Sequence, residues 1–160
     1  MPTKKLDRID RKILEEIQQN GSISNLELAE KINLSPSPCS RRVKHLEDAG
    51  IIDKQVTLLN KDALGLPLTV YIHVSLEKQF TKTLENFERH IITYSEVQEC
   101  SLITGSDADY LLKVLMPDMS YYEKFLLKEL NQIEGVSSIR TSFVMRQVLS
   151  RTELPLSHIN

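Results

Sequence analysis

One stretch constrains this chain most, a helix from Ser35 to Gly50 whose two ends are both marked. Ser35 is suited to be the N-cap, its side-chain oxygen accepting a backbone N–H. Pro36 then falls at the first helical position, where no donor is needed. Gly50 fits the left-handed residue that follows a helix. Between these ends, three apolar residues recur at helical spacing and predict a narrow buried stripe: Cys39, Val43 and Leu46.

The face opposite this stripe is cationic and rich in hydroxyl groups. At about 100° per residue it carries Ser37, Ser40, Arg41, Lys44 and His45, and no carboxylate precedes Glu47. Such a face suits phosphates and base edges in a DNA major groove. An ordinary amphipathic surface helix can carry the same face. The residues that precede the helix are therefore needed to distinguish a DNA-binding helix from an ordinary one.

Two shorter helices are predicted upstream. Asp7 can cap the first, which ends at Asn20-Gly21, and Ser24 with Glu27 forms a capping-box pattern that opens the second. The inner face of the second helix is predicted to hold Leu26, Leu28, Ala29 and Ile32. Together with the cationic helix these elements predict a helix-turn-helix, and residues 51–59 are expected to add a short β-ribbon, or wing.

The second part of the chain has a different pattern, beginning after the polar, helix-breaking residues 60–67. Residues 69–76 alternate with period two, which is typical of a strand. Strands 97–103, 110–115 and 136–148 and helices 80–93 and 120–132 complete a βαββαβ order, the ferredoxin-like unit. We therefore predict an α+β chain: a winged helix-turn-helix domain at 1–59, a linker at 60–67, a ferredoxin-like domain at 68–150 and a tail at 151–160, packed on a neighbour or disordered.

The charge is close to balanced, with a net value of −2. Residues 1–60 hold 10 Lys+Arg against 9 Asp+Glu, and residues 61–160 hold 10 against 13, which agrees with a first domain that faces nucleic acid. The two cysteines, Cys39 and Cys100, are far apart and predict buried free thiols in a reducing compartment. With no signal peptide and no apolar run of about 18 residues, no membrane contact and a cytoplasmic location are expected.

An enzyme is the competing class. Cys39 and Cys100 are the candidate nucleophiles, with one of the four histidines as base: His45, His73, His90 or His158. Neither cysteine lies in a nucleophile motif, and the sequence has no phosphate-binding glycine loop and no zinc spacing. We expect no catalytic residue, no metal and no cofactor.

Several strings resemble one family across nearly the whole chain. LDRIDRKILEEIQQNG, ISNLELAEKINLSPSPCSRRVKHLEDAGII, EVQECSLITG, DYLLKVLMPDMSYYEKF and GVSSIRTSFVM resemble the Lrp/AsnC, or feast/famine, prokaryotic transcription regulators. The resemblance implies dimers formed through the second domain, commonly four to a ring, which makes an octamer. It also implies an amino-acid effector bound between effector domains, beside the glycine loop that follows the second strand.

That loop is Gly105-Ser106-Asp107-Ala108-Asp109-Tyr110, one residue longer than the family's usual Gly-x-x-Asp-Tyr. Asp107 or Asp109 can accept from the ammonium of a zwitterion, and backbone N–H groups around Gly105 and Ser106 can hold its carboxylate. The alternative is a tight turn capped by aspartate side chains. The predicted effector residues are Gly105, Ser106, Asp107, Asp109 and Tyr110.

The leading hypothesis is therefore a ligand-responsive transcription regulator that binds double-stranded DNA. Arg41, Arg42 and Lys44 are expected to contact phosphate or guanine, although Arg42 lies near the buried side and can brace the motif instead. Ser35 and Ser37 are expected at phosphates, helped by the helix N-terminus, and Ser40 at a base edge. The complete predicted DNA-binding set is Ser35, Ser37, Pro38, Ser40, Arg41, Arg42, Lys44 and His45. The alternative is an architectural DNA-binding protein without an effector.

Overall fold

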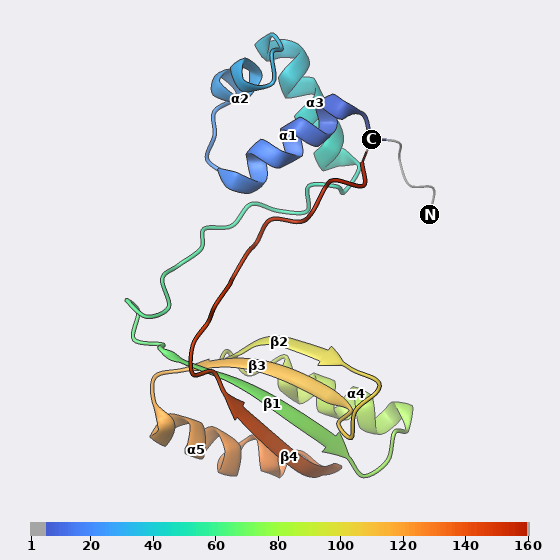
Figure 1. Cartoon of the computed structure of the whole chain (residues 1–160). Helices are drawn as coiled ribbons and strands as arrows, with labels where there is room; N and C mark the ends of the chain where they lie inside the picture. Colours follow the sequence, from blue (N-terminus) through green and yellow to red (C-terminus); the bar gives the residue numbers. More distant parts are fainter. Residues whose placement is uncertain (1–5, 160) are drawn as a thin grey trace. The chain divides into compact units, whose positions relative to one another are not determined.

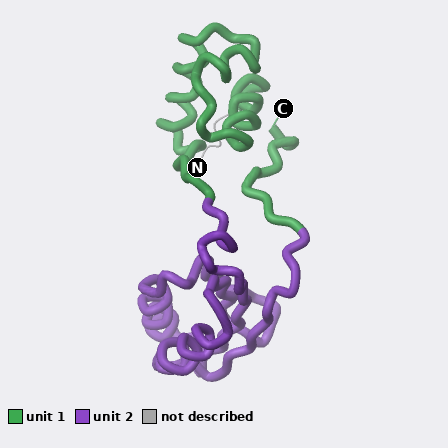
Figure 2. The backbone as a smooth tube through the Cα atoms, turned by 90° about the vertical axis from the view of Figure 1, so that its left-hand side faces the viewer, with its two compact units in different colours: residues 1–58, 149–160 green, residues 59–148 purple. Residues whose placement is uncertain are grey.

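The computed structural model describes residues 6–159 and divides the chain into two compact units. The first unit contains the residues up to Leu58 together with those from Leu149 on, and the second is Leu59–Val148 (Figure 2). No helix among the described residues is long and apolar enough to cross a lipid bilayer.

The first unit is built on three helices, α1 (Arg8–Gln19), α2 (Asn25–Lys31) and α3 (Pro36–Asp48). The predicted cap at Asp7 and the predicted capping box at Ser24 are both present, and Asp7 also forms a capping box with Asp10. Asp7 accepts from the N–H groups of Ile9 and Asp10, and Ser24 exchanges hydrogen bonds with Glu27. The helices enclose a small core whose buried members are Ile13, Leu14, Leu28, Ala29, Ile32, Cys39 and Leu46.

Leu26 does not join that core, contrary to the sequence prediction. It lies at the start of α2 with 63% of its surface exposed, because the buried side of this short helix is set by Leu28, Ala29 and Ile32. The β-ribbon expected over 51–59 is also absent. Residues 53–60 carry neither helix nor strand, and no strand within the described chain pairs with them.

The C-terminal end of α3 forms as predicted, whereas its N-cap does not. Gly50 has φ +67° and closes the helix as expected, while the Ile51 N–H bonds to the Leu46 carbonyl. Ser35 is the N-cap residue, but its side chain makes no capping hydrogen bond. Pro38 occupies the third helical position and has no N–H to donate, so the usual partner of an N-cap serine is missing.

The second unit is a four-stranded antiparallel sheet in the order β2-β3-β1-β4. Its elements are β1 (Leu68–Leu76), α4 (Thr81–Ile91), β2 (Val97–Leu102), β3 (Tyr110–Met116), α5 (Met119–Lys128), the 3-10 turn η1 (Leu130–Gln132) and β4 (Val136–Phe143). Figure 1 shows α4 and α5 on one side of this sheet. Alternate residues of β1 and β3 are buried beneath them with Phe87, Ile91, Tyr122 and Phe125, as the period-two pattern predicted.

The last strand is shorter than predicted. β4 ends at Phe143 rather than at residue 148. Its register with β1 runs as far as the Val70–Phe143 pair, and one further hydrogen bond joins the Val144 N–H to the Thr69 carbonyl. Residues 145–155 are exposed, among them Met145 and Val148.

The tail packs on the first unit. Leu154 exchanges two hydrogen bonds with Gln18 of α1, its N–H donating at 2.6 Å and its carbonyl accepting at 3.3 Å. Arg11 donates to the Ile159 carbonyl at 3.2 Å, and Leu156 packs against the core of the three helices. The helical unit is therefore completed by residues from the far end of the chain.

Candidate functional site

The outer face of α3 is open to solvent. Six of the eight residues predicted to bind DNA are exposed on it, namely Ser35, Ser37, Ser40, Arg41, Lys44 and His45, while Pro38 and Arg42 are half-buried. Within residues 6–159, Arg41 and Lys44 make neither an ion pair nor a side-chain hydrogen bond with the protein. Their charges are therefore available to a polyanion.

The start of α3 offers few backbone donors. Pro36 and Pro38 have no N–H, and the Cys39 N–H already bonds to the Ser35 carbonyl, which leaves Ser37 as the donor of the first turn. The contribution of the helix terminus to phosphate binding is therefore smaller than we expected from the sequence. The Asn25 side chain donates to the Pro36 carbonyl at 2.9 Å, which joins α2 to this first turn.

Arg42 braces the motif, which is the second of its two predicted roles. Its Nη1 donates to Asp7 Oδ2 at 2.8 Å and to Asp10 Oδ1 at 2.7 Å, at the N-terminus of α1. These bonds, first to Asp10 and then to Asp7, raise the pKa of Arg42. Because the guanidinium is engaged by two carboxylates, this contact supports a role for Arg42 in positioning α3.

A separate hollow of about 560 Å³ lies in the second unit. It is formed where β1 ends, before α4, and by the loop that joins β2 to β3. Its lining residues are Ser75, Leu76, Gln79, Leu84 and the continuous run 102–109. The loop predicted to bind the effector is therefore one wall of a real concavity.

The loop that lines this hollow has backbone N–H groups without a partner in the protein. Gly105 has φ +85°, a conformation that glycine adopts without strain. Within the described chain, the N–H groups of Gly105, Ser106 and Asp107 have no hydrogen-bond partner. Successive free N–H groups form a concavity that can bind a carboxylate.

The two candidate aspartates differ sharply. Asp109 is 8% exposed, and its Oδ2 accepts from the Leu76 N–H at 2.7 Å while its Oδ1 accepts from the Gln79 side-chain amide. The Asp107 side chain is 95% exposed and lies 3.8 Å from Arg140. Asp107 is therefore largely solvated, whereas Asp109 is a fixed carboxylate at the edge of the hollow.

Tyr110, which was predicted from the sequence to contact the effector, is not among the residues that line the hollow. Its ring is buried against Phe87, with centroids 4.6 Å apart, and its hydroxyl donates to Glu88 at 2.7 Å. Burial, followed by the Glu88 carboxylate, raises the pKa of Tyr110 far above its usual value. The reason is the strand alternation, which directs Tyr110 toward α4.

Sequence reasoning missed four lining residues. Ser75 and Leu76 come from the end of β1, Gln79 from the connection that follows it, and Leu84 from α4. The predicted strand order could have indicated that the end of the first strand lies beside the loop. In a βαββαβ unit the first and third strands are antiparallel neighbours, so the exit of β1 lies beside the entry of β3.

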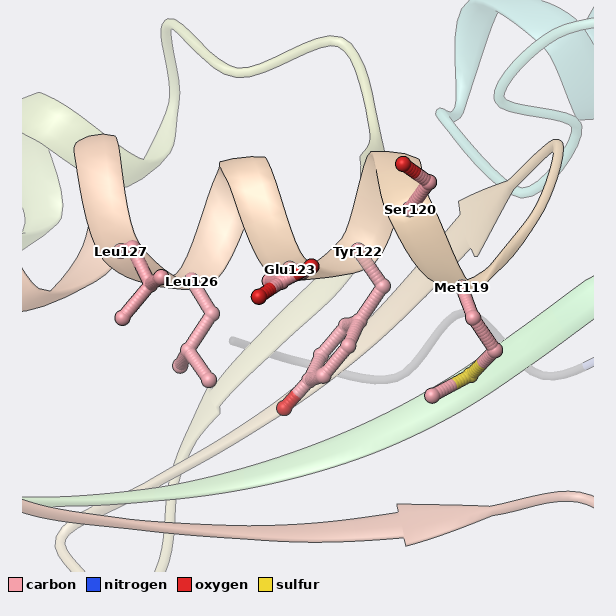
Figure 3. Close-up of a pocket in the computed structure, with 6 residues that line it drawn as sticks. All are labelled: Met119, Ser120, Tyr122, Glu123, Leu126 and Leu127. Atoms are coloured by element: carbon pink, nitrogen blue, oxygen red, sulfur yellow. The ribbon is translucent and has the colours of Figure 1, made fainter.

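A second hollow of about 540 Å³ runs along α5. It is lined by Met119, Ser120, Tyr122, Glu123, Leu126 and Leu127, and Figure 3 shows Tyr122 and Leu126 extending from one side of the helix while Ser120 extends from the other. All six lining residues belong to α5, and the loop that was predicted to bind the effector takes no part in this hollow.

Neither cysteine is placed for catalysis. Cys39 is buried in the helical core, and burial raises the pKa of its thiol. Cys100 is exposed, contrary to the sequence prediction of a buried thiol, and partial desolvation together with the nearby Glu88 carboxylate raises its pKa to about 11. Both thiols are therefore protonated at neutral pH and are poor nucleophiles.

A helix-turn-helix with a free cationic helix, joined to a second domain with its own ligand-sized hollow, defines a DNA-binding regulator with a ligand-binding domain. Residues 6–53 match the model of a winged helix-turn-helix DNA-binding domain, and residues 69–154 match the Lrp/AsnC ligand binding domain. The chain belongs to the Lrp/AsnC family of transcription regulators, and its members are not enzymes.

Relatives are similar over nearly their full length. The leucine-responsive regulatory protein of Escherichia coli K12 is 43% identical over 153 residues, which is 96% of this chain and 93% of that protein. A transcriptional regulator from Neisseria meningitidis, solved in complex with L-methionine, is 39% identical with a TM-score of 0.93, covering 97% of this chain and 99% of the other. An AsnC family regulator from Agrobacterium tumefaciens is 33% identical with a TM-score of 0.91, and the match covers 97% of this chain and 100% of that regulator.

Proposed function

We propose that this protein binds double-stranded DNA through α3 and that an amino acid with an apolar side chain, bound in the hollow beside the 105–109 loop, changes that binding. The observation that carries the ligand half is the row of unpaired N–H groups at Gly105, Ser106 and Asp107. These donors match a ligand carboxylate, and Asp109 supplies negative charge for its ammonium.

The walls of the hollow set the side-chain class. Leu76, Leu84 and Leu102 line it, so an aliphatic or thioether side chain gains from burial there. The names of two relatives support an apolar amino acid, since one is called leucine-responsive and another was solved with L-methionine.

The DNA half rests on the exposed face of α3. Arg41 and Lys44 are proposed to contact phosphate or guanine, and Ser40 a base edge. Four further residues complete this proposed face, at the N-terminus and in the later turns of the helix: Ser35, Ser37, Pro38 and His45. Both cysteines are free, which together with a DNA partner supports a cytoplasmic location.

A homodimer is proposed through the second unit, with assembly to an octamer as in the family. Among the described residues, no helix covers the second face of the sheet, where Tyr71, His73, Leu111 and Leu115 are half-buried. A second copy placed on this face would bury those side chains and pair two recognition helices, which raises affinity for a two-part operator. Sedimentation equilibrium across protein concentration tests the assembly.

A melting assay with each of the twenty amino acids tests the ligand half. Leucine, methionine or another apolar amino acid should raise Tm, because a ligand that binds only the folded state stabilises it. The same amino acid should shift the midpoint of a DNA titration at constant salt. If none of the twenty shifts Tm, the proposal fails and an architectural DNA-binding protein becomes the better description.

A further inference from the structure

We infer that Gln79 is a specificity-determining residue of the hollow, with its side-chain carbonyl oxygen accepting a hydrogen bond from the ligand's ammonium. The inference rests on the proposed function and deepens it, since it names the group that separates an α-amino acid from the same acid without an amine.

Gln79 reaches the hollow because of strand pairing and not because of sequence proximity. It lies in the connection between β1 and α4, and Asp109 lies immediately before β3. The β1–β3 ladder pairs Val74 with Tyr110, and the Asp109 N–H donates to the Val74 carbonyl at 2.9 Å. The exit of one strand is thereby fixed against the entry of the other, and both residues line the same hollow.

The amide of Gln79 is held in one orientation. Its Nε2 donates to Asp109 Oδ1, while the Leu76 N–H donates to Asp109 Oδ2 at 2.7 Å. A carboxylate accepts and does not donate, so it selects the nitrogen side of the amide and leaves Oε1 on the other side. Within the described chain Oε1 has no hydrogen-bond partner.

This free oxygen fits an ammonium better than the alternatives do. An ammonium has three donors and needs acceptors in more than one direction. Each Asp109 oxygen already accepts one bond, so Asp109 supplies charge and at most its remaining lone pairs. Asp107 is 95% exposed, and water and salt screen its charge. Gln79 Oε1 is an uncommitted acceptor beside the fixed carboxylate.

A ligand that lacks the amine would lose this bond. The 2-hydroxy acid analogue has a hydroxyl in place of the ammonium, so it keeps the carboxylate and the side chain but carries no positive charge. A hydrogen bond to a charged group contributes more than one between neutral groups, so Gln79 should favour the amino acid by about 10-fold.

The test compares two ligands on four proteins. L-methionine and 2-hydroxy-4-(methylthio)butanoate are titrated, by calorimetry and by Tm shift, into the full-length wild type, Gln79→Met, Gln79→Glu and Gln98→Met. Gln98 is the matched control, an exposed glutamine of β2 outside the hollow whose amide donates to the Ser95 carbonyl at 3.1 Å.

The inference predicts that Gln79→Met binds L-methionine about 10-fold more weakly, with little change for the hydroxy acid, and that Gln98→Met behaves as wild type. Gln79→Glu keeps an acceptor oxygen but loses the donor to Asp109, so it should keep the preference for the amine even though the unliganded protein melts lower.

Two results would overturn the inference. One is an unchanged preference in Gln79→Met, and the other is a loss in Gln79→Glu as large as in Gln79→Met, which would mean that Gln79 only holds Asp109. If L-methionine does not bind the wild type and no apolar amino acid raises its Tm in the melting assay, the proposed apolar amino-acid effector itself fails, and that outcome is seen before any variant is measured.

Discussion

Arg42 of α3 and Asp10 of α1 are separated by 32 residues, yet Arg42 Nη1 lies 2.7 Å from Asp10 Oδ1. The same nitrogen reaches Asp7, whose carboxylate caps α1. One guanidinium therefore fixes the recognition helix against the N-terminus of the first helix, and the exposed cations of α3 are presented from a braced element.

Replacing Arg42 with Met should destabilise the helical unit. The change leaves Asp7 and Asp10 without their cation, and since the group is partly exposed the expected loss is about 1 kcal/mol in the free energy of unfolding. Urea denaturation of the full chain measures it. Arg41→Met, on the exposed face of the same helix, is the control and should leave the stability within error.

The free energy of unfolding should also fall at acid pH. The Asp10 backbone N–H, and after it Arg42, hold the pKa of Asp7 below its ordinary value of 3.8. In the unfolded chain Asp7 takes up its proton first, so its contribution is complete above that value and is lost as pH falls through the lower, folded pKa. Unfolding curves between about pH 5 and pH 2 should show this loss, and Asp7→Asn should make the dependence shallower. An unchanged pH profile in Asp7→Asn would contradict it.

Removing the free cations of α3 should weaken DNA binding without unfolding the protein. Arg41→Ala and Lys44→Ala should each reduce the slope of log affinity against log salt by about 1, because each lost phosphate contact releases fewer counterions. Lys124→Ala, on α5 in the second unit, is the control. If both α3 variants keep the wild-type affinity and slope, α3 is not the DNA-binding face.

The tail should stabilise the helical unit through Leu156. Leu156→Ala should cost about 1 kcal/mol, since the side chain is half-buried against the core of the three helices. Leu154→Ala is the matched control, because that side chain is exposed and only its backbone bonds to Gln18. Thermal melts of the two variants should therefore separate, and equal melts would show that the tail does not contribute through packing.

Gly50→Ala should shorten or strain the end of α3. Gly50 has φ +67°, so a side chain there costs about 1 kcal/mol even though a Cβ would meet no neighbour. Gly21→Ala tests the same chemistry at a glycine that lacks a positive φ and also has open space around it. A Tm drop confined to the Gly50 variant is the expected result.

The candidate DNA face could be predicted because it lies on a single helix. The spacing of Arg41 and Lys44 within α3 decides which side they share, and both are exposed on that side. The hollow in the second unit could be predicted only in part. Its loop is one continuous stretch, but Gln79 and Asp109 are 30 residues apart and meet through the β1–β3 ladder.

Local chemistry decided the helix ends of this protein. The capping boxes at Asp7 and Ser24 and the turn at Gly50 involve residues within five positions of each other, so the sequence alone determined them. Partners distant along the chain decided the rest. The end of β4 at Phe143, the lack of a strand at residues 53–60, the burial of Tyr110 and the ion pairs of Arg42 all depend on such partners. Pairing and burial are determined by which surfaces meet when the chain is folded.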